Sequence, residues 1–233
     1  MYKNFKIKAP FFEIGPKAYI YGEKMLELAR VIDRTAVKYD VDIILTPQYT
    51  DIKMLADNTE RIFIFAQHMD YLPAGRGLGS VLPEAVKAAG AVGVMLNHAE
   101  KKLTYDEIEK TIARADEVGL ATIVCADTVE EISIIARMSP NLLVAEPTDL
   151  IGTGKTSDSS YIKETIENVK AINPDIMVLQ AAGISNGQDV YNTIKQGAMA
   201  TGSTSGILKA TDPAAMVEEM ISSLRRAWDE IHK

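Results

Sequence analysis

Three polar side chains follow short apolar runs of this chain and could together move a proton. They are Lys17, His98 and Glu146. A carboxylate can remove a proton from carbon, an imidazole can exchange a proton with oxygen, and an ammonium group stabilises negative charge developing on oxygen. These groups suit a proton shift between the adjacent carbons of a hydroxycarbonyl compound. Each residue alone also has a plain structural reading, so the hypothesis depends on finding all three together.

The segment that follows Glu146 has the composition of a loop that closes over a ligand. It reads Glu-Pro-Thr-Asp-Leu-Ile-Gly-Thr-Gly-Lys and ends at Lys155. Pro147 restricts the backbone beside the carboxylate, whereas Gly152 and Gly154 permit hinge-like changes and expose backbone amides to an anion. We therefore expect a gate beside the glutamate.

Elements that could position these groups alternate regularly along the chain. Short apolar, β-branched runs are separated by amphipathic segments of about 10 to 15 residues, which is typical of βαβ units on a parallel sheet. The predicted strands are Phe11–Lys17, Val41–Pro47, Arg61–Gln67, Val92–His98, Ala121–Asp127, Leu142–Pro147, Ile176–Gly183 and Ala198–Thr204. Helix starts are indicated by Thr104 with Glu107, Thr128 with Glu131, and Asp212-Pro213.

Eight such units are compatible with a closed barrel or with an open doubly wound sheet. The segment after Lys17 lacks the G-x-G-x-x-G pattern of a dinucleotide-binding sheet, and glycines gather instead after the sixth, seventh and eighth strands. Barrel enzymes commonly build a phosphate site there. We therefore predict one (β/α)8 barrel domain over residues 1–233, with residues 1–9 as a short N-terminal extension.

Composition narrows the function classes. The 233 residues are 47% hydrophobic and 24% charged, as in an ordinary globular protein. Basic residues are scattered and the net charge is −7, so we expect neither a nucleic-acid partner nor an anionic membrane surface. No apolar run approaches the roughly 18 residues of a membrane span. The single cysteine, Cys125, fits a buried core position in a cytoplasmic protein, and no residue spacing indicates a metal site.

Several segments match one known family in order and spacing. The run from Glu146 to Gly154 resembles the E-P-x-x-x-I-G-T-G closing loop of triosephosphate isomerases, and residues 97–102 resemble the N-H-S-E-K-R segment of short, archaeal-type members. Residues 66–67, 182–185 and 205–210 match as well. The resemblance covers the chain from about residue 11 to its end and implies a TIM barrel, in agreement with the alternation of elements.

The resemblance also implies roles for particular residues. Glu146 would be the base, His98 the electrophile that relays a proton between oxygens, and Lys17 the cation that binds substrate. Glu100 matches a family glutamate beside the lysine. Phosphate contacts, largely through backbone amides, are implied for Gly152, Gly183, Thr204 and Ser205.

The reaction implied is the interconversion of D-glyceraldehyde 3-phosphate and dihydroxyacetone phosphate through an enediolate, a step of glycolysis and gluconeogenesis. The implied partners are a small phosphorylated sugar and further copies of the chain, in a homodimer or homotetramer. Neither a cofactor nor a metal is required by such proton transfer.

The chain departs from the family pattern at three places. Gly15-Pro16 precedes Lys17 where the family has N-x, a Gly75–Gly79 segment replaces the family's third loop, and Ala99 replaces a serine. Asn4-Phe5-Lys6 also spells N-F-K, but choosing it would leave the first predicted strand without a place. The departures leave two alternatives open, namely an isomerase for another small aldose or ketose phosphate and a non-catalytic phosphosugar-binding barrel.

Overall fold

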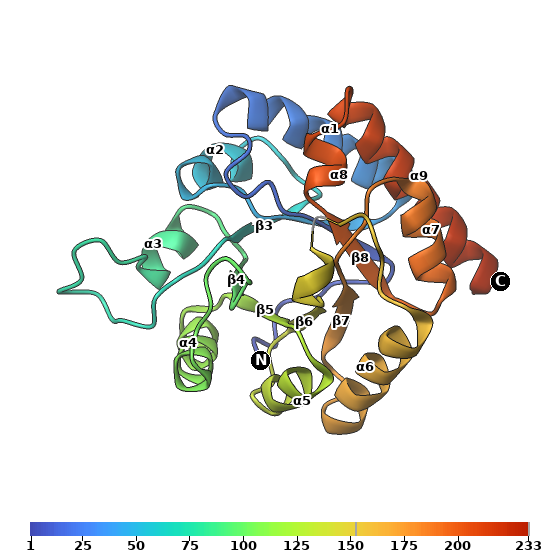
Figure 1. The fold of residues 1–233 in the computed structure, drawn as a ribbon. Coiled ribbons are helices and arrows are strands. Elements are labelled where there is room, and N and C mark those ends of the chain that lie inside the picture. Colours follow the sequence, from blue (N-terminus) through green and yellow to red (C-terminus); the bar gives the residue numbers. More distant parts are fainter. Residues whose placement is uncertain (152, 233) are drawn as a thin grey trace.

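The computed structural model describes residues 1–151 and 153–232, and its centre is a closed parallel barrel (Figure 1). The eight strands follow one another around the barrel in chain order, and β1 pairs with β8. This confirms the predicted fold class. The strands are β1 (Phe11–Ile14), β2 (Asp42–Leu45), β3 (Phe63–Ala66), β4 (Gly93–Leu96), β5 (Ala121–Ala126), β6 (Leu142–Ala145), β7 (Met177–Gln180) and β8 (Ala200–Ser203).

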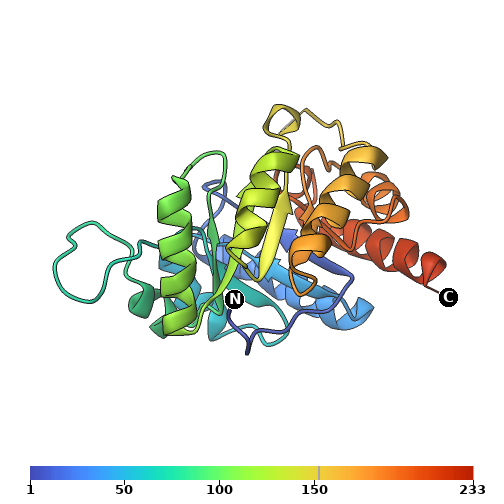
Figure 2. The ribbon, with the colours of Figure 1, turned by 90° about the horizontal axis from the view of Figure 1, so that it is seen from below.

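Helices surround the strands on the outside, as both ribbon views show (Figures 1 and 2). The α-helices are α1 (Glu23–Tyr39), α2 (Ile52–Ala56), α3 (Pro83–Ala88), α4 (Tyr105–Val118), α5 (Val129–Arg137), α6 (Ser159–Ile172), α7 (Gly187–Lys195), α8 (Ser205–Leu208) and α9 (Pro213–Ile231), with 3₁₀ turns η1 (Tyr49–Asp51) and η2 (Thr148–Leu150). None of the helices in residues 1–151 and 153–232 has the length and apolar content needed to cross a bilayer.

Strand periodicity divides the buried side chains into two layers. In β1, Phe11 joins a cluster inside the barrel with Ile44 and Phe65, whereas Phe12 and Ile14 belong to the larger cluster between strands and helices. Successive side chains of a strand point to opposite faces. Glu13 therefore points into the barrel, one layer above Phe11.

Helices α4, α5 and α9 begin at the predicted capping residues. The Thr104 hydroxyl accepts a hydrogen bond from the Glu107 amide while the Glu107 carboxylate accepts from the Thr104 amide, which forms a capping box at α4. Thr128 caps α5, and Asp212 caps α9 in front of its first-turn proline.

All eight predicted strands are present, but they are shorter than expected. β1 ends at Ile14, so Lys17 lies in the following turn rather than at a strand end. Pro16 has no amide hydrogen with which to continue the strand ladder. The backbone of Lys17 then takes a left-handed conformation with φ of 50°.

The N-terminal segment packs across the opposite end of the barrel. The Phe5 ring meets Phe63 and Phe65 edge-on, with centroids 5.3 and 5.5 Å away. Asn141, just before β6, exchanges two hydrogen bonds with the Tyr2 backbone. The N-F-K tripeptide at residues 4–6 therefore lies at the end of the barrel away from Lys17.

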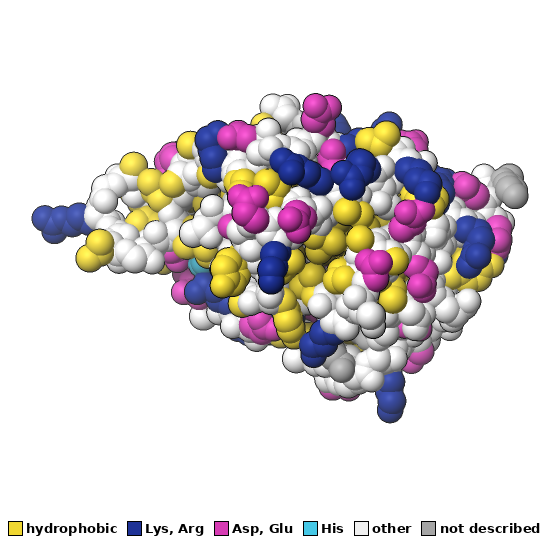
Figure 3. Space-filling model, turned by 90° about the horizontal axis from the view of Figure 1, so that it is seen from above, with side chains coloured by type: hydrophobic (Ala, Val, Ile, Leu, Met, Phe, Trp, Pro, Cys, Tyr) yellow, Lys and Arg dark blue, Asp and Glu magenta, His cyan; other side chains and the backbone are white. Residues whose placement is uncertain are grey.

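A long loop after β3 projects from the body of the protein as an arm, residues 71–82 (Figures 1 and 2). Two hydrogen bonds close its base: the Asp70 amide donates to the Val81 carbonyl oxygen, and the Val81 amide donates to the Asp70 carboxylate. Leu78 is fully exposed on the arm. In the space-filling view, hydrophobic side chains and a basic one extend along it (Figure 3).

Candidate active site

The C-terminal ends of the strands surround a cavity of about 450 Å³. Its strand residues form a floor that is mostly apolar, and the loops after the strands form its rim. The floor consists of Glu13, Met95, Cys125, Val144, Leu179, Gly202 and Ser203. The volume falls in the range of small-molecule sites, about 300–1,000 Å³.

Two glutamine side chains hold Lys17 at the rim. The amide groups of Gln48 and Gln67 both donate to the Lys17 carbonyl oxygen, at 2.6 and 2.9 Å. These bonds fix the unusual left-handed backbone of the lysine. The Lys17 ammonium lies 2.8 Å from the Glu100 carboxylate and lines the cavity.

His98 is oriented by the loop that follows β4. Its Nδ1 accepts a hydrogen bond of 3.1 Å from the backbone amide of Glu100. Because Nδ1 is the acceptor, a neutral ring carries its proton on Nε2. Burial lowers the pKa of His98, and the Lys17 charge lowers it further, so the neutral imidazole is favoured.

Asn97, the residue before His98, holds this loop in place through its side chain. Asn97 is buried with φ of 57°, and its side-chain amide donates to the Cys125 carbonyl and to the Glu131 carboxylate. Its side-chain oxygen accepts from the Leu103 amide. Asn97 thus ties the loop after β4 to strand β5 and helix α5.

Glu146 follows β6 directly, and its amide donates to the Ala126 carbonyl in β5. Its Oε2 lies 4.0 Å from His98 Nε2. Burial raises the pKa of Glu146, while the Lys17 charge partly offsets that rise. A raised pKa makes the ionised carboxylate a stronger base.

Gly183, Thr204 and Ser205, which lie in the segments after β7 and β8, line the same cavity as Glu146. Gly183 has φ of 72°, and a Cβ atom there would lie 1.9 Å from the Lys155 carbonyl oxygen. Only glycine fits both the backbone conformation and this contact. Gly152, the fourth residue expected to contact phosphate, lies outside the described residues.

The structure therefore gathers Lys17, His98, Glu100 and Glu146 around one cavity, together with three of the four residues expected to contact phosphate. Sequence reasoning missed Glu13, Gln48 and the supporting role of Asn97. Glu13 could have been noticed in the sequence, because it is the one charged residue among the apolar residues of β1.

Two further residues, Cys125 and His68, have structural surroundings. Cys125 is buried as expected, although its side chain also reaches the cavity floor, and burial raises the pKa of its thiol. His68 is buried and its Nε2 lies 3.3 Å from the Asp70 carboxylate. Among residues 1–151 and 153–232, no three His, Cys, Asp or Glu side chains are grouped to hold a metal ion.

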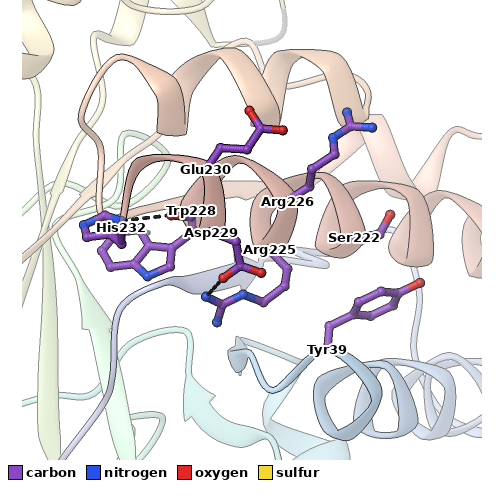
Figure 4. A pocket seen from close by; sticks show the side chains of 8 residues that line it. All are labelled: Tyr39, Ser222, Arg225, Arg226, Trp228, Asp229, Glu230 and His232. Atoms are coloured by element: carbon purple, nitrogen blue, oxygen red, sulfur yellow. Dashed lines mark hydrogen bonds and ion pairs between the residues drawn. The ribbon is translucent and has the colours of Figure 1, made fainter.

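A second and larger hollow, of about 740 Å³, lies on the outside of the barrel between α9 and Tyr39 of α1 (Figure 4). Arg225 and Asp229 pair with each other there, while Arg226 and Glu230 point to another side of α9. Because these charged groups do not converge on one point, the smaller cavity at the strand ends is the stronger candidate.

A (β/α)8 barrel with titratable groups at the C-terminal ends of its strands belongs to the class of barrel enzymes that act on small molecules in that cavity. Comparison with known proteins identifies the family within this class. The model of the family described as triosephosphate isomerase matches residues 14–220.

Curated relatives agree with this match over nearly their whole length. A triosephosphate isomerase of Methanobacterium bryantii is 36% identical over 222 residues, which cover 93% of this chain and 98% of that protein. The enzyme of Sulfurisphaera tokodaii is 36% identical over 96% of this chain and 99% of its own, and that of Saccharolobus solfataricus is 34% identical over 95% and 99%. The chain belongs to the triosephosphate isomerase family.

Proposed function

We propose that Glu146, His98 and Lys17 carry out the proton transfers of this aldose–ketose isomerase. The reaction interconverts D-glyceraldehyde 3-phosphate and dihydroxyacetone phosphate. The observation that carries the assignment is the pairing of a half-buried carboxylate with an imidazole whose Nε2 lies 4.0 Å away. Triosephosphate isomerase is a standard illustration of such a pair, a glutamate base beside a neutral histidine.

In this proposal each group acts at a different atom of the substrate. Glu146 removes the proton from the carbon beside the carbonyl group. The Nε2 proton of His98 is shared with the carbonyl oxygen and is relayed between the two substrate oxygens. Lys17 stabilises the negative charge of the enediolate, and its ion pair with Glu100 keeps the ammonium group at the rim. The chemistry is proton transfer alone and calls for neither cofactor nor metal.

The phosphate group would bind where the segments after β7 and β8 line the cavity. We assign it to Gly183, Thr204 and Ser205, with Gly152 completing the set when the loop that begins at Glu146 closes. The tight packing of Gly183 against Lys155 supports this assignment, because it joins the two loops that would have to enclose the anion. Closure of such a loop excludes water from the enediolate.

Assembly and location are parts of the same proposal. We expect residues 1–233 to form one barrel domain and to assemble as a homodimer or homotetramer in the cytoplasm. The exposed Leu78 and the projecting arm support self-association, because a side chain of this kind gains by burial against a partner. Light scattering on the purified protein would measure the mass, and a monomer at micromolar concentration would contradict this part.

Isomerisation of glyceraldehyde 3-phosphate in a coupled assay tests the function. The Glu146→Gln variant should lower kcat by about 10³-fold, since general base catalysis contributes about 10²–10⁴-fold, while phosphate-ligand affinity stays within about tenfold. Glu164→Gln on the exposed face of α6 is the matched control and should keep wild-type activity. Near-full activity of Glu146→Gln would remove this residue from the role of base.

A further inference from the structure

A second glutamate, Glu13, lies in the same cavity as Glu146 and has no part in the proton transfers assigned above. It is 9% exposed, points into the barrel from β1 and lines the cavity floor. The other floor residues offer thioether, thiol, aliphatic and hydroxyl groups. Within the described part of the chain, Glu13 is thus the one carboxyl group on an otherwise uncharged floor.

Two glycines make room for this carboxyl group. Gly202 is the register partner of Glu13 on β8, and a Cβ atom on Gly202 would lie 3.1 Å from Glu13 Oε2. A Cβ atom on Gly15 would lie 3.0 Å from Glu13 Oε1 and close to the hydroxyls of Thr46 and Thr204. The carboxyl group therefore fills the space beside Lys17 that a side chain at position 15 would otherwise need.

Residues 1–151 and 153–232 engage only one of the two carboxyl oxygens. The Thr46 hydroxyl donates a hydrogen bond of 3.0 Å to Oε1. No described residue forms a hydrogen bond with Oε2. Oε2 is not one of the fully buried side-chain oxygens that lack a partner, so it remains accessible from the cavity, where an atom of a ligand can reach it.

The surroundings also determine the protonation state of Glu13. Burial raises the pKa of Glu13 to about 8, with a further upward contribution from Glu146, against the opposing effects of Thr46 and Lys17. The group is thus a neutral acid at pH 7. Because Oε1 accepts from Thr46, the acid proton resides on Oε2, where it can be donated to an oxygen in the cavity.

We propose that Glu13 contacts the substrate, with Oε2 donating a hydrogen bond to a carbonyl or hydroxyl oxygen at the cavity floor, and that it thereby determines which phosphorylated compounds the site accepts. The inference rests on the proposed function for the class of substrate. It adds a specificity-determining residue to the base, the imidazole and the ammonium group. Sites built to hydrogen-bond a substrate oxygen discriminate strongly against analogues that lack it.

The test compares two unreactive ligands, glycerol 3-phosphate and n-propyl phosphate, which share the carbon chain and the phosphate but differ in the hydroxyl groups. Calorimetric titration at pH 7 should give the wild-type protein an affinity for glycerol 3-phosphate at least tenfold higher than for propyl phosphate. Glu13→Leu should lower this ratio at least fivefold while leaving the propyl phosphate affinity within twofold. Glu13→Gln, whose amide offers a donor in the same place, should keep the ratio within threefold.

Two further variants keep the test decisive. Thr46→Val removes the hydroxyl that orients Oε1 and should lower the ratio in the same direction as Glu13→Leu, which covers the case that Glu13→Leu does not fold. Asp42→Asn alters a buried carboxylate at the other end of the barrel and should leave the ratio unchanged. Equal wild-type affinities for the two ligands, or an unchanged ratio in Glu13→Leu or a folded Thr46→Val, would overturn the inference.

The binding measurement is separate from the isomerase assay. A wild-type protein without isomerase activity whose ligand discrimination still depends on Glu13 would refute the proposed function and support the inference. An active isomerase whose ligand discrimination does not depend on Glu13 would support the proposed function and refute the inference.

Discussion

The two ends of the barrel treat a buried carboxyl group in opposite ways. Asp42, at the start of β2, has both oxygens engaged, one by the Arg61 guanidinium at 2.5 Å and one by the Lys8 amide at 2.8 Å. Glu13, near the end of the adjacent β1, has one oxygen engaged and a strongly raised pKa. Both oxygens of Asp42, near the N-terminal ends of the strands, thus have partners within the protein. Glu13, at the mouth, has one oxygen that can still form a hydrogen bond with a ligand.

The same contrast extends to the neighbouring residues. Aromatic rings of Phe5, Phe63 and Phe65 fill the N-terminal end of the barrel, whereas the mouth holds an open cavity with displaced pKa values at His98 and Glu146. Perturbed titratable groups in a cavity are typical of functional sites. The comparison indicates that one end of this barrel provides stability and that the other is organised for binding and chemistry.

The largest expected effect comes from removing the ammonium group at the mouth. Lys17→Met should lower kcat/KM by about 10³-fold, which is the upper range for losing one group that stabilises a developing oxyanion. The melting temperature should change by less than about 3 °C, because the Glu100 partner is 65% exposed and exposed ion pairs contribute about 0–1 kcal/mol. Steady-state kinetics and calorimetry on the same preparation check both parts. A large loss of stability would show that the mouth also supports the fold.

The second effect concerns stability, and Glu13→Gln is expected to be more stable than the wild-type protein at neutral and alkaline pH. The folded-state pKa of Glu13 is raised, so the folded wild-type protein keeps a proton that the unfolded chain loses as the pH rises from 4.5 towards 8. Wild-type stability therefore falls through this window, whereas the variant has no such group. At 1.36 kcal/mol per pKa unit the difference at pH 8 has an upper limit of about 5 kcal/mol.

Urea unfolding of both proteins between pH 5 and pH 9 measures this difference. The gap in unfolding free energy should widen from pH 5 to pH 8 in favour of Glu13→Gln and then stay constant. Parallel curves for the two proteins would contradict a neutral Glu13 in the folded state.

The smallest of these effects is expected at the N-terminal end. Phe5→Ala removes a half-buried ring that packs against Phe63 and Phe65, and it should lower the free energy of unfolding by about 2 kcal/mol, below the full cost for a buried phenylalanine. Because the ring lies far from the cavity, kcat should stay within twofold. Chemical unfolding measures the change in stability, and steady-state kinetics measures kcat. A tenfold loss of kcat would contradict the conclusion that the N-terminal end serves stability alone.

The fold was predictable because its signals are local. β-branched runs, the capping box at Thr104 and the Asp212-Pro213 helix start each depend on a few adjacent residues, and the closed barrel confirms them. The rule that polar groups follow the C-terminal ends of barrel strands located His98 and Glu146 in the cavity. Lys17 also reaches the cavity, although from a turn three residues beyond β1.

The supporting residues could not be predicted in this way, because their roles arise from tertiary contacts. Gln48 and Gln67 bind the Lys17 carbonyl from 31 and 50 positions along the chain. The pKa of Glu13 depends on burial produced by the pairing of β1 with β8, the last pairing that closes the barrel. Spacing in the sequence contains neither kind of information.

Closure of the barrel also bears on how the protein behaves in a crowded solution. Since β1 pairs with β8, none of the eight described strands is an edge strand. Free edges are the usual starting points for intermolecular sheet growth and fibril formation. Aggregation of the folded protein through its sheet is therefore blocked by topology, and contacts between copies have to be made by side chains of the surrounding helices and loops.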